Sequence, residues 1–156
     1  MTVEGSGREG ASLGYPERSQ PAIIVSACLL GVECNHRGEA NTSEEAVRLA
    51  DDFRVIPVCP ESIGGLPTPR PAAERRPDGS VVAEDGSDVT DAYELGARAT
   101  VELARVSGAR RAVLKARSPS CGCHQIAVNG QLVDGEGVTA EALRAAGLEL
   151  QSEEDI

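Results

Sequence analysis

Three short apolar segments, each followed by a cysteine, most constrain what this chain can fold into. They lie at residues 22–25 (AIIV), 53–58 (FRVIPV) and 111–116 (RAVLKA), and stretches with helical spacing separate them. Continuous runs rich in β-branched residues are typical of strands that are buried on both faces. Strands that alternate with helices predict an α/β fold in which helices flank a small, mainly parallel, Rossmann-like sheet.

The segments between the strands predict helices with recognisable ends. Thr42 and Glu45 form a capping-box pattern, which predicts a short helix from about Ser43. Residues 90–108 have the clearest helical pattern, with acidic residues early and a glycine at the end. Residues 139–147 predict a second capped helix that ends at its own glycine.

Turn residues predict the remaining local structure. Asn129 and Gly130 stand between two apolar runs, so we expect a hairpin near residues 126–133. Pro57 within the second strand indicates an edge position, because proline cannot donate a hydrogen bond to a neighbouring strand. Residues 148–151 (LELQ) predict a short last strand, and the glycine- and proline-rich residues 62–80 predict a long loop of functional type.

The chain length of 156 residues is that of one domain. Residues 1–20 are rich in Gly, Ser, Glu and Arg without periodicity, and predict a disordered N-terminal tail. The apolar and periodic segments all fall within residues 21–152, which we expect to form a single α/β domain. No pattern in the sequence indicates an oligomeric state.

Composition excludes several classes of partner. The formal net charge of −10 and the three aromatic residues disfavour binding to a nucleic-acid polymer, which needs basic patches and stacking platforms. No apolar run is long enough to span a membrane, and residues 1–21 have no signal-peptide core, so we expect a cytoplasmic protein. Five cysteines in a reducing compartment favour metal binding or catalysis over disulfides.

Three of these cysteines follow predicted parallel strands. Cys28, Cys59 and Cys121 each come after the carboxyl end of a strand, where open α/β folds hold their ligands. Converging thiolates suit a soft metal, and their spacing alone leaves zinc and an iron–sulfur cluster equally open. Three protein ligands on a four-iron cluster would leave one iron free to bind a substrate.

Four longer blocks carry a resemblance to a known family. The sequence is similar, over about residues 23–149, to a small bacterial family formerly described as a domain of unknown function, whose characterised member is a 2-thiouracil desulfidase. The blocks are VSACLLGVEC, VIPVCPESIGGLPTPRPAAE, GSDVTDAYELGA and LKARSPSCG. The resemblance implies a [4Fe–4S] cluster on three cysteines. It also implies desulfuration of a small thiolated heterocycle such as 2-thiouracil, giving uracil and sulfide.

The resemblance also assigns expected roles to single residues. Cys28, Cys59 and Cys121 would hold the cluster, and residues 21–152 would form the desulfidase-like domain. Glu61 would transfer protons, while Ser118 and Ser120 would bind or orient a thiolated nucleobase or nucleoside.

The chain also departs from the family pattern. Residues 35–38 read NHRG where relatives commonly read Arg-Tyr-Asp-Gly, which puts His36 in place of an aromatic residue and leaves the exact substrate open. Cys123 is not part of the family pattern.

Other chemistry-bearing residues have structural interpretations. We expect Cys34 to be structural rather than a fourth ligand, and His36 and His124 to be solvated rather than metal ligands. We expect Arg70 and Glu74 to form an ion pair that holds the proline-rich loop; the alternative is that Arg70 reaches an anionic substrate. Lys115 fits either a surface lysine or a positive charge beside an anionic cluster. We expect the acidic residues 152–156 to be solvated.

Two functions of other classes fit the same residues. One is a non-enzymatic iron–sulfur or redox sensor, which needs an output surface that the sequence does not display. The other is a zinc-binding protein, which would favour a fourth ligand such as Cys34 or a histidine.

Overall fold

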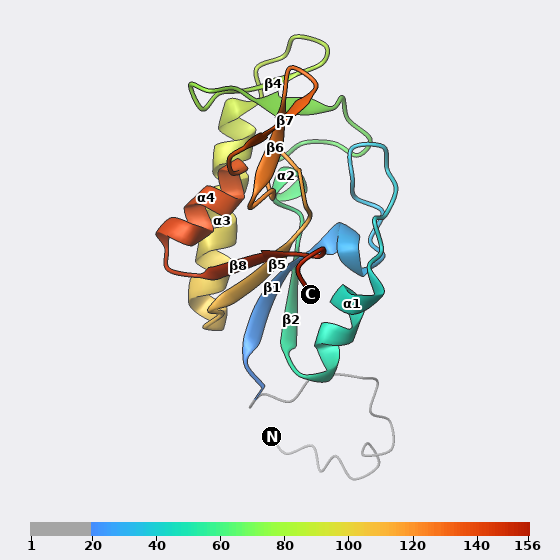
Figure 1. The fold of residues 1–156 in the computed structure, drawn as a ribbon, viewed down its shortest axis with the longest axis vertical. Coiled ribbons are helices and arrows are strands. Elements are labelled where there is room, and N and C mark those ends of the chain that lie inside the picture. Colours follow the sequence, from blue (N-terminus) through green and yellow to red (C-terminus); the bar gives the residue numbers. More distant parts are fainter. Residues whose placement is uncertain (1–19) are drawn as a thin grey trace, which may run out of the picture.

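The computed structural model describes residues 20–156, so the predicted tail lies, except for its last residue, outside the described part. Four parallel strands form the central sheet in the order β2-β1-β5-β8 (Figure 1). Their bounds are Ala22–Ser26 (β1), Arg54–Val58 (β2), Arg111–Leu114 (β5) and Glu149–Ser152 (β8). The predicted α/β class with a mainly parallel sheet is confirmed.

Strand β1 lies inside the sheet and is buried on both faces. Its side chains alternate between two apolar cores: Ile24 packs with residues of one face, and Ile23 and Val25 with residues of the other. The continuous apolar run at residues 22–25 therefore reports double-sided burial, as in other parallel sheets.

Helices cover both faces of the sheet (Figure 1). Helices α3 (Thr90–Ser107) and α4 (Val138–Ala145) pack on one face. The short helix α1 (Glu44–Arg48) and the 3₁₀ helices η2 (Ala27–Leu30) and η3 (Leu49–Asp51) lie toward the other. Within residues 20–156, no helix has both the length and the apolar character needed to cross a membrane.

Most predicted helix ends are confirmed, with two caps reassigned by one residue: the C-cap of α4 is Ala146 rather than the expected Gly147, and the N-cap of α1 also differs. Helix α3 ends at the cap residue Gly108, and Gly147 follows directly after the C-cap of α4. Helix α1 begins as expected, but its N-cap is Ser43, whose Oγ accepts the Ala46 N–H at 3.2 Å. Thr42 was the expected cap, and one residue separates the two alternatives.

Strand β2 is an edge strand, as Pro57 predicted. It pairs only with β1 among the sheet strands, and Pro57 lies opposite Val25 in the register. Edge strands have one side without a partner, and this is the position at which sheets tolerate proline.

Two antiparallel hairpins extend from one end of the sheet (Figure 1). The hairpin of β6 (Gln125–Val128) and β7 (Gln131–Asp134) confirms the Asn129-Gly130 prediction: both turn residues have positive φ, 54° and 78°. The other joins β3 (Ala73–Arg75) and β4 (Val81–Ala83). Strand β3 lies within residues 62–80, a segment that the sequence predicted as loop.

Glu74 connects the two hairpins. Its carboxylate accepts the backbone N–H groups of Asn129 at 2.8 Å and Gly130 at 3.0 Å. The expected ion pair between Glu74 and Arg70 is therefore wrong: Glu74 binds the turn of the other hairpin.

The short helix α2 (Pro60–Ile63) packs closely against α3 through two glycines. A Cβ atom on Gly96 would lie 2.0 Å from the carbonyl oxygen of Pro60, and one on Gly64 would lie 2.0 Å from that of Ala92. The two backbones can approach this closely only because both positions lack a side chain.

We predict that Gly96→Ala destabilises the protein although alanine is the better helix former. The clash with the Pro60 carbonyl should lower the free energy of unfolding by about 1–3 kcal/mol, against a propensity gain of about 1 kcal/mol. Urea unfolding measures the difference. Glu94→Ala, at an exposed position of the same helix, is the control and should change stability little. A stabilised Gly96→Ala variant would contradict the close approach.

Candidate functional site

Three cysteines line one cavity of about 330 Å³ at the carboxyl edge of the sheet. Cys28 lies in η2 directly after β1, Cys59 directly follows β2, and Cys121 lies in the turn after β5. The three strands are parallel, so their carboxyl ends meet at this edge. The structure thus brings together the three cysteines that the sequence singled out.

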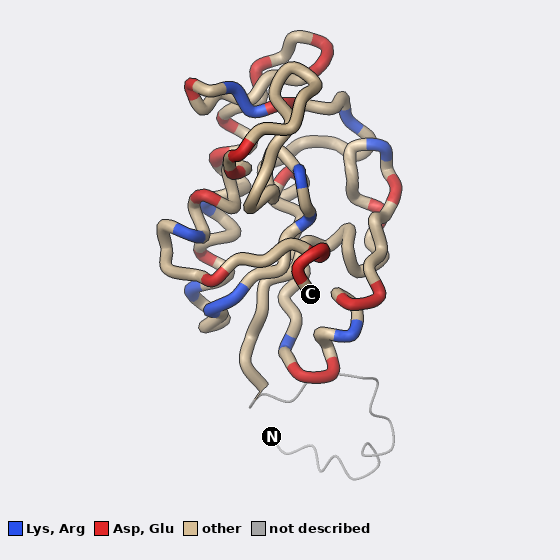
Figure 2. The backbone as a smooth tube through the Cα atoms, in the orientation of Figure 1, with Lys and Arg blue, Asp and Glu red and all other residues tan. Residues whose placement is uncertain are grey.

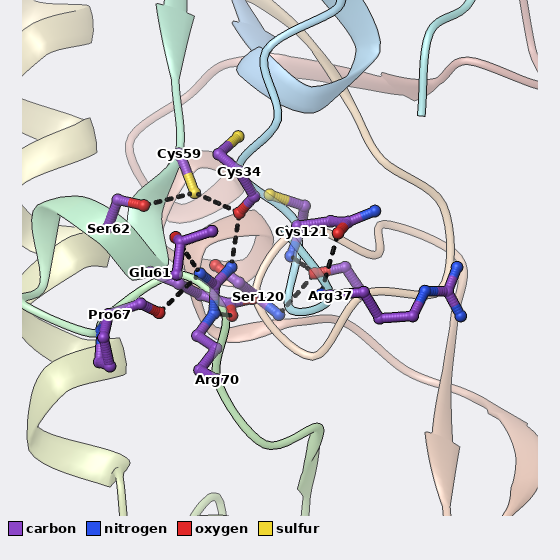
Figure 3. A network of polar contacts seen from close by, with 12 residues as sticks. Cys34, Arg37, Cys59, Glu61, Ser62, Pro67, Arg70, Ser120 and Cys121 are labelled. Atoms are coloured by element: carbon purple, nitrogen blue, oxygen red, sulfur yellow. Dashed lines mark hydrogen bonds and ion pairs between the residues drawn. The ribbon is translucent and has the colours of Figure 1, made fainter. Parts of the chain in front are cut away.

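Local hydrogen bonds fix each of these cysteines. Cys28 is hydrogen-bonded with Asn41. Cys59 is the N-cap of α2, and its Sγ accepts a hydrogen bond from the Ser62 hydroxyl at 3.3 Å (Figure 3). The backbone N–H of Cys121 donates to Ser118 Oγ at 3.0 Å.

Burial and the neighbouring sulfurs raise the pKa of two of these thiols, Cys121 and Cys28. Burial raises the pKa of Cys121 to about 12, and the nearby sulfurs of Cys28 and Cys59 act in the same direction. Burial also raises the pKa of Cys28, which the hydrogen bond with Asn41 and then the charge of Lys115 partly oppose. The sulfur atoms are therefore close enough to influence one another's ionisation.

Cys34 adds a fourth thiol to the same cavity. Cys34 is buried. Burial is the main cause that raises the pKa of its thiol, and the neighbouring Cys59 sulfur raises it further. The Cys34 carbonyl accepts a long hydrogen bond from the Cys59 thiol at 3.7 Å. Cys34 is thus within reach of the three-cysteine group, a position that its place in a loop of the sequence did not reveal.

Glu61 and Arg70 form a buried ion pair beside the cysteines (Figure 3). Arg70 Nε donates to Glu61 Oε1 at 2.7 Å, and the side chains are 5% and 13% exposed. The remaining guanidinium nitrogens donate to the Pro67 carbonyl (3.2 Å), Thr68 Oγ1 (2.9 Å) and the Cys34 carbonyl (2.9 Å). One arginine therefore connects the proline-rich loop, the Cys34 loop and Glu61.

Tyr93 is a cavity residue that sequence reasoning missed. It comes from the first turn of α3, is 2% exposed, and hydrogen-bonds with Glu61. Burial, reinforced by the negative charge of Glu61, raises its pKa. Its place in one of the family blocks and the scarcity of aromatics were the available signals.

The two candidate serines have different surroundings. Ser118 lines the cavity, and its Oγ accepts the N–H groups of Ser120 and Cys121, each at 3.0 Å. Ser120 is 1% exposed, and its hydroxyl is hydrogen-bonded with Thr139 Oγ1 at 3.0 Å. Ser120 is not one of the cavity-lining residues. Contact of either serine with a substrate stays a prediction.

Basic residues at the cavity are bonded to the acidic C-terminal residues. Lys115 Nζ lies 3.3 Å from Glu153, and Arg117 lies 2.8 Å from Glu154. The Ala116 N–H also donates to Glu153 at 2.8 Å. The expectation that the C-terminal acids are simply solvated is therefore wrong.

The two histidines lie in different places. His36 lines the cavity, and its carbonyl accepts the Arg70 N–H at 2.8 Å. His124 lies outside the cavity, and its Nε2 is 2.7 Å from Asp155 Oδ2. His124 is thus engaged with a carboxylate rather than free in solvent as expected.

Comparisons with known proteins agree with this arrangement. A family model described as 2-thiouracil desulfurase matches residues 23–155. The solved structure of the [4Fe-4S]-dependent thiouracil desulfidase TudS is similar with a TM-score of 0.81 and 41% identity, over 88% of this chain and 93% of that one. An uncharacterized protein of Bacillus subtilis, YbbK, is 36% identical over 86% of this chain and 97% of its own length. The resemblance identified from the sequence blocks is confirmed.

We predict that Arg70→Met strongly destabilises the protein. It leaves the Glu61 carboxylate and the Cys34 carbonyl without their buried partner, which should lower the free energy of unfolding by about 3–5 kcal/mol. Chemical unfolding measures the loss. Arg105→Met is the matched control, because Arg105 forms an exposed ion pair with Glu102 and should matter little. Equal effects of the two substitutions would contradict a special role for Arg70.

Proposed function

The chain belongs to the 2-thiouracil desulfurase family, and from that premise we propose that it removes sulfur from a small thiolated pyrimidine by hydrolysis. The proposal rests on one observation above all: three cysteines from three parallel strand ends line one cavity that also contains Glu61. The solved relative at 41% identity, described as [4Fe-4S]-dependent, supports the same assignment.

We assign Cys28, Cys59 and Cys121 as the residues that would hold a [4Fe–4S] cluster. Their donor set fits this group, because cysteine thiolates are the usual ligands of such clusters. The hydrogen bonds of Asn41 to Cys28 and of Ser62 to Cys59 would orient two of the ligands and tune their charge. When bound, a cluster with one iron free of protein ligands supplies a Lewis acid with affinity for thione sulfur.

Glu61 is the proposed proton-transfer residue. Hydrolysis replaces C=S by C=O, consumes one water and releases hydrogen sulfide, so it needs proton transfer but no net electron transfer. The Glu61 carboxylate would accept a proton from the attacking water and return it to the departing sulfur. Arg70 at Oε1 and the hydrogen bond with Tyr93 hold this carboxylate in place.

The cavity sets limits on the substrate. Its volume of about 330 Å³ is at the lower end of the range for small-ligand sites, about 300–1,000 Å³. A single heterocyclic ring fits this space. Polar side chains from Asn41, His36 and Ser118 line it and could bind ring nitrogens and oxygens. We therefore propose a thiolated pyrimidine base or nucleoside as the substrate, in agreement with the relative's description.

The zinc alternative has one specific observation in its favour. Cys34 lines the same cavity, so four thiols are available, and four cysteines are a common structural zinc site. The two possibilities differ in what Cys34 does. A closed zinc site needs it as a ligand, whereas a cluster with an open iron does not.

We predict that the protein purified without oxygen contains near-equal iron and acid-labile sulfide and converts 2-thiouracil to uracil. Cys28→Ser, Cys59→Ser and Cys121→Ser should each lose the cluster, because each removes one of three protein ligands. Cys34→Ser should keep its iron, and serves as the matched control within the same cavity. Iron, sulfide and zinc analysis measures the cluster content of each variant, and chromatography of the products from the same samples measures uracil formation. Zinc without sulfide, lost in Cys34→Ser, would establish the alternative.

We predict that Glu61→Gln keeps the cluster but lowers kcat by about 10²–10⁴-fold, the usual contribution of a general acid–base group. Glutamine retains an oxygen that can accept from Arg70 but cannot carry the proton. Steady-state kinetics together with iron content separate loss of chemistry from loss of cluster. Glu102→Gln, at an exposed position of α3, is the control. Unchanged kcat in Glu61→Gln would assign proton transfer to another group.

A further inference from the structure

Three metal-binding side chains meet outside the cysteine cavity. Cys123, His124 and Asp155 place a sulfur, a ring nitrogen and a carboxylate oxygen within 4.8 Å of one another. None of the three lines the cavity that contains Cys28, Cys59 and Cys121. Two of them follow Cys121 in the turn after β5, and the third lies in the turn after β8.

The donor set is that of a borderline-soft divalent cation. Thiolate, imidazole and carboxylate are the three side-chain ligands of zinc, and sites with three protein ligands complete the tetrahedron with water. Hard cations such as Mg²⁺ and Ca²⁺ take oxygen ligands, so the sulfur and nitrogen disfavour them. Cys123 is 4% exposed, whereas the His124 side chain is 59% exposed, so an ion could reach the buried sulfur from the solvent side.

The spacing suits one ion after small side-chain movements. Zinc bond lengths of about 2.0–2.3 Å with tetrahedral angles separate two donor atoms by about 3.3–3.6 Å. The distance from His124 Nε2 to Asp155 Oδ2 is 2.7 Å, which is shorter than this separation. The upper limit on the distances among the three ligand atoms is 4.8 Å, which is longer. Asp155 Oδ2 also accepts the Ser152 N–H at 2.7 Å, which fixes the carboxylate in place.

The surrounding charge does not oppose a cation. Glu136 and Asp155 lie near enough to act on the Cys123 sulfur, opposed by the guanidinium of Arg144. Arg144 is itself ion-paired with Glu136 and hydrogen-bonded to the Cys123 carbonyl at 3.5 Å. Residues 153–155 at the C-terminal end of the chain are all acidic (Figure 2), and Glu153 and Glu154 are paired with Lys115 and Arg117. A divalent ion would therefore enter a region whose fixed charge is negative or balanced.

We propose that Cys123, His124 and Asp155 form a second metal site that binds Zn²⁺ and is separate from the cysteine cavity. A bound ion would join the C-terminal turn to the turn that presents Cys121. The same C-terminal turn contains Glu153, which binds Lys115 and the Ala116 N–H beside the cavity. The proposed consequence of binding is that the ion would restrain the segment from which the third cysteine of the cavity projects.

The test is zinc binding to the full chain purified without oxygen. The protein is equilibrated with chelator-buffered Zn²⁺, and zinc, iron and sulfide are counted on the same sample. We expect about one zinc per chain in addition to the iron, with the iron content unchanged, and a higher melting temperature in the presence of zinc.

Variants assign the bound ion to this site. His124→Ala and Asp155→Asn should weaken zinc binding at least about tenfold and remove the melting-temperature shift, because each deletes one ligand. Cys123→Ser should do the same. The His124 substitution keeps the test valid if the buried serine prevents folding, since His124 is exposed. Asp52→Asn makes the same charge change at an exposed position and should bind zinc normally.

Three outcomes would overturn the inference: no zinc bound at micromolar concentration, zinc bound equally well by His124→Ala and Asp155→Asn, or zinc taken up only as iron is lost. The last would mean that zinc occupies the cavity cysteines instead. The inference does not rest on the proposed desulfuration, because the variants lie outside the cavity and the readout is zinc binding rather than turnover.

Discussion

The shared direction of the strands is the constraint on which the rest of the site depends. Strand β1 pairs in parallel with β2 on one side and β5 on the other. Parallel pairing puts three carboxyl ends at one edge, and each is followed within a few residues by Cys28, Cys59 or Cys121. Residues far apart in the sequence therefore share a cavity, although long crossover connections separate the strands. An antiparallel β2 would have put Cys59 at the opposite edge.

Each of three basic side chains at the cavity is paired with one acidic side chain, although the chain as a whole is acidic. The chain has a formal net charge of −10, yet Arg70, Lys115 and Arg117 all line the cavity. Each is bonded to one carboxylate, from Glu61, Glu153 and Glu154 respectively. Lysine and arginine beside several thiols stabilise negative charge on sulfur. Because two of these carboxylates follow β8, the C-terminal residues are part of the site's electrostatic framework.

The sequence predicted what depends on local pattern and missed what depends on side-chain pairing in space. Apolar runs, Gly108 and Asn129-Gly130 identified the sheet strands, the end of α3 and the hairpin, because hydrophobic periodicity and turn chemistry act over a few residues. Strand β3 was missed, since its sequence AER has no strand pattern and is ordered by pairing with β4. Arg70 was assigned to Glu74, four residues away, whereas the loop brings it to Glu61. No local rule distinguishes these two acids.

Cys34 shows why the number of thiols alone does not decide the chemistry of the cavity. Four cysteines line it, but three follow sheet strands and the fourth lies in a loop held by Arg70 through its carbonyl oxygen. A ligand at a strand end inherits the rigidity of the sheet, whereas Cys34 depends on a buried ion pair for its position. That difference supports the proposed assignment of three cysteine ligands, with Cys34 as an adjacent, separately supported thiol. An open coordination position is what hydrolysis at a metal centre requires, and a closed set of four would remove it.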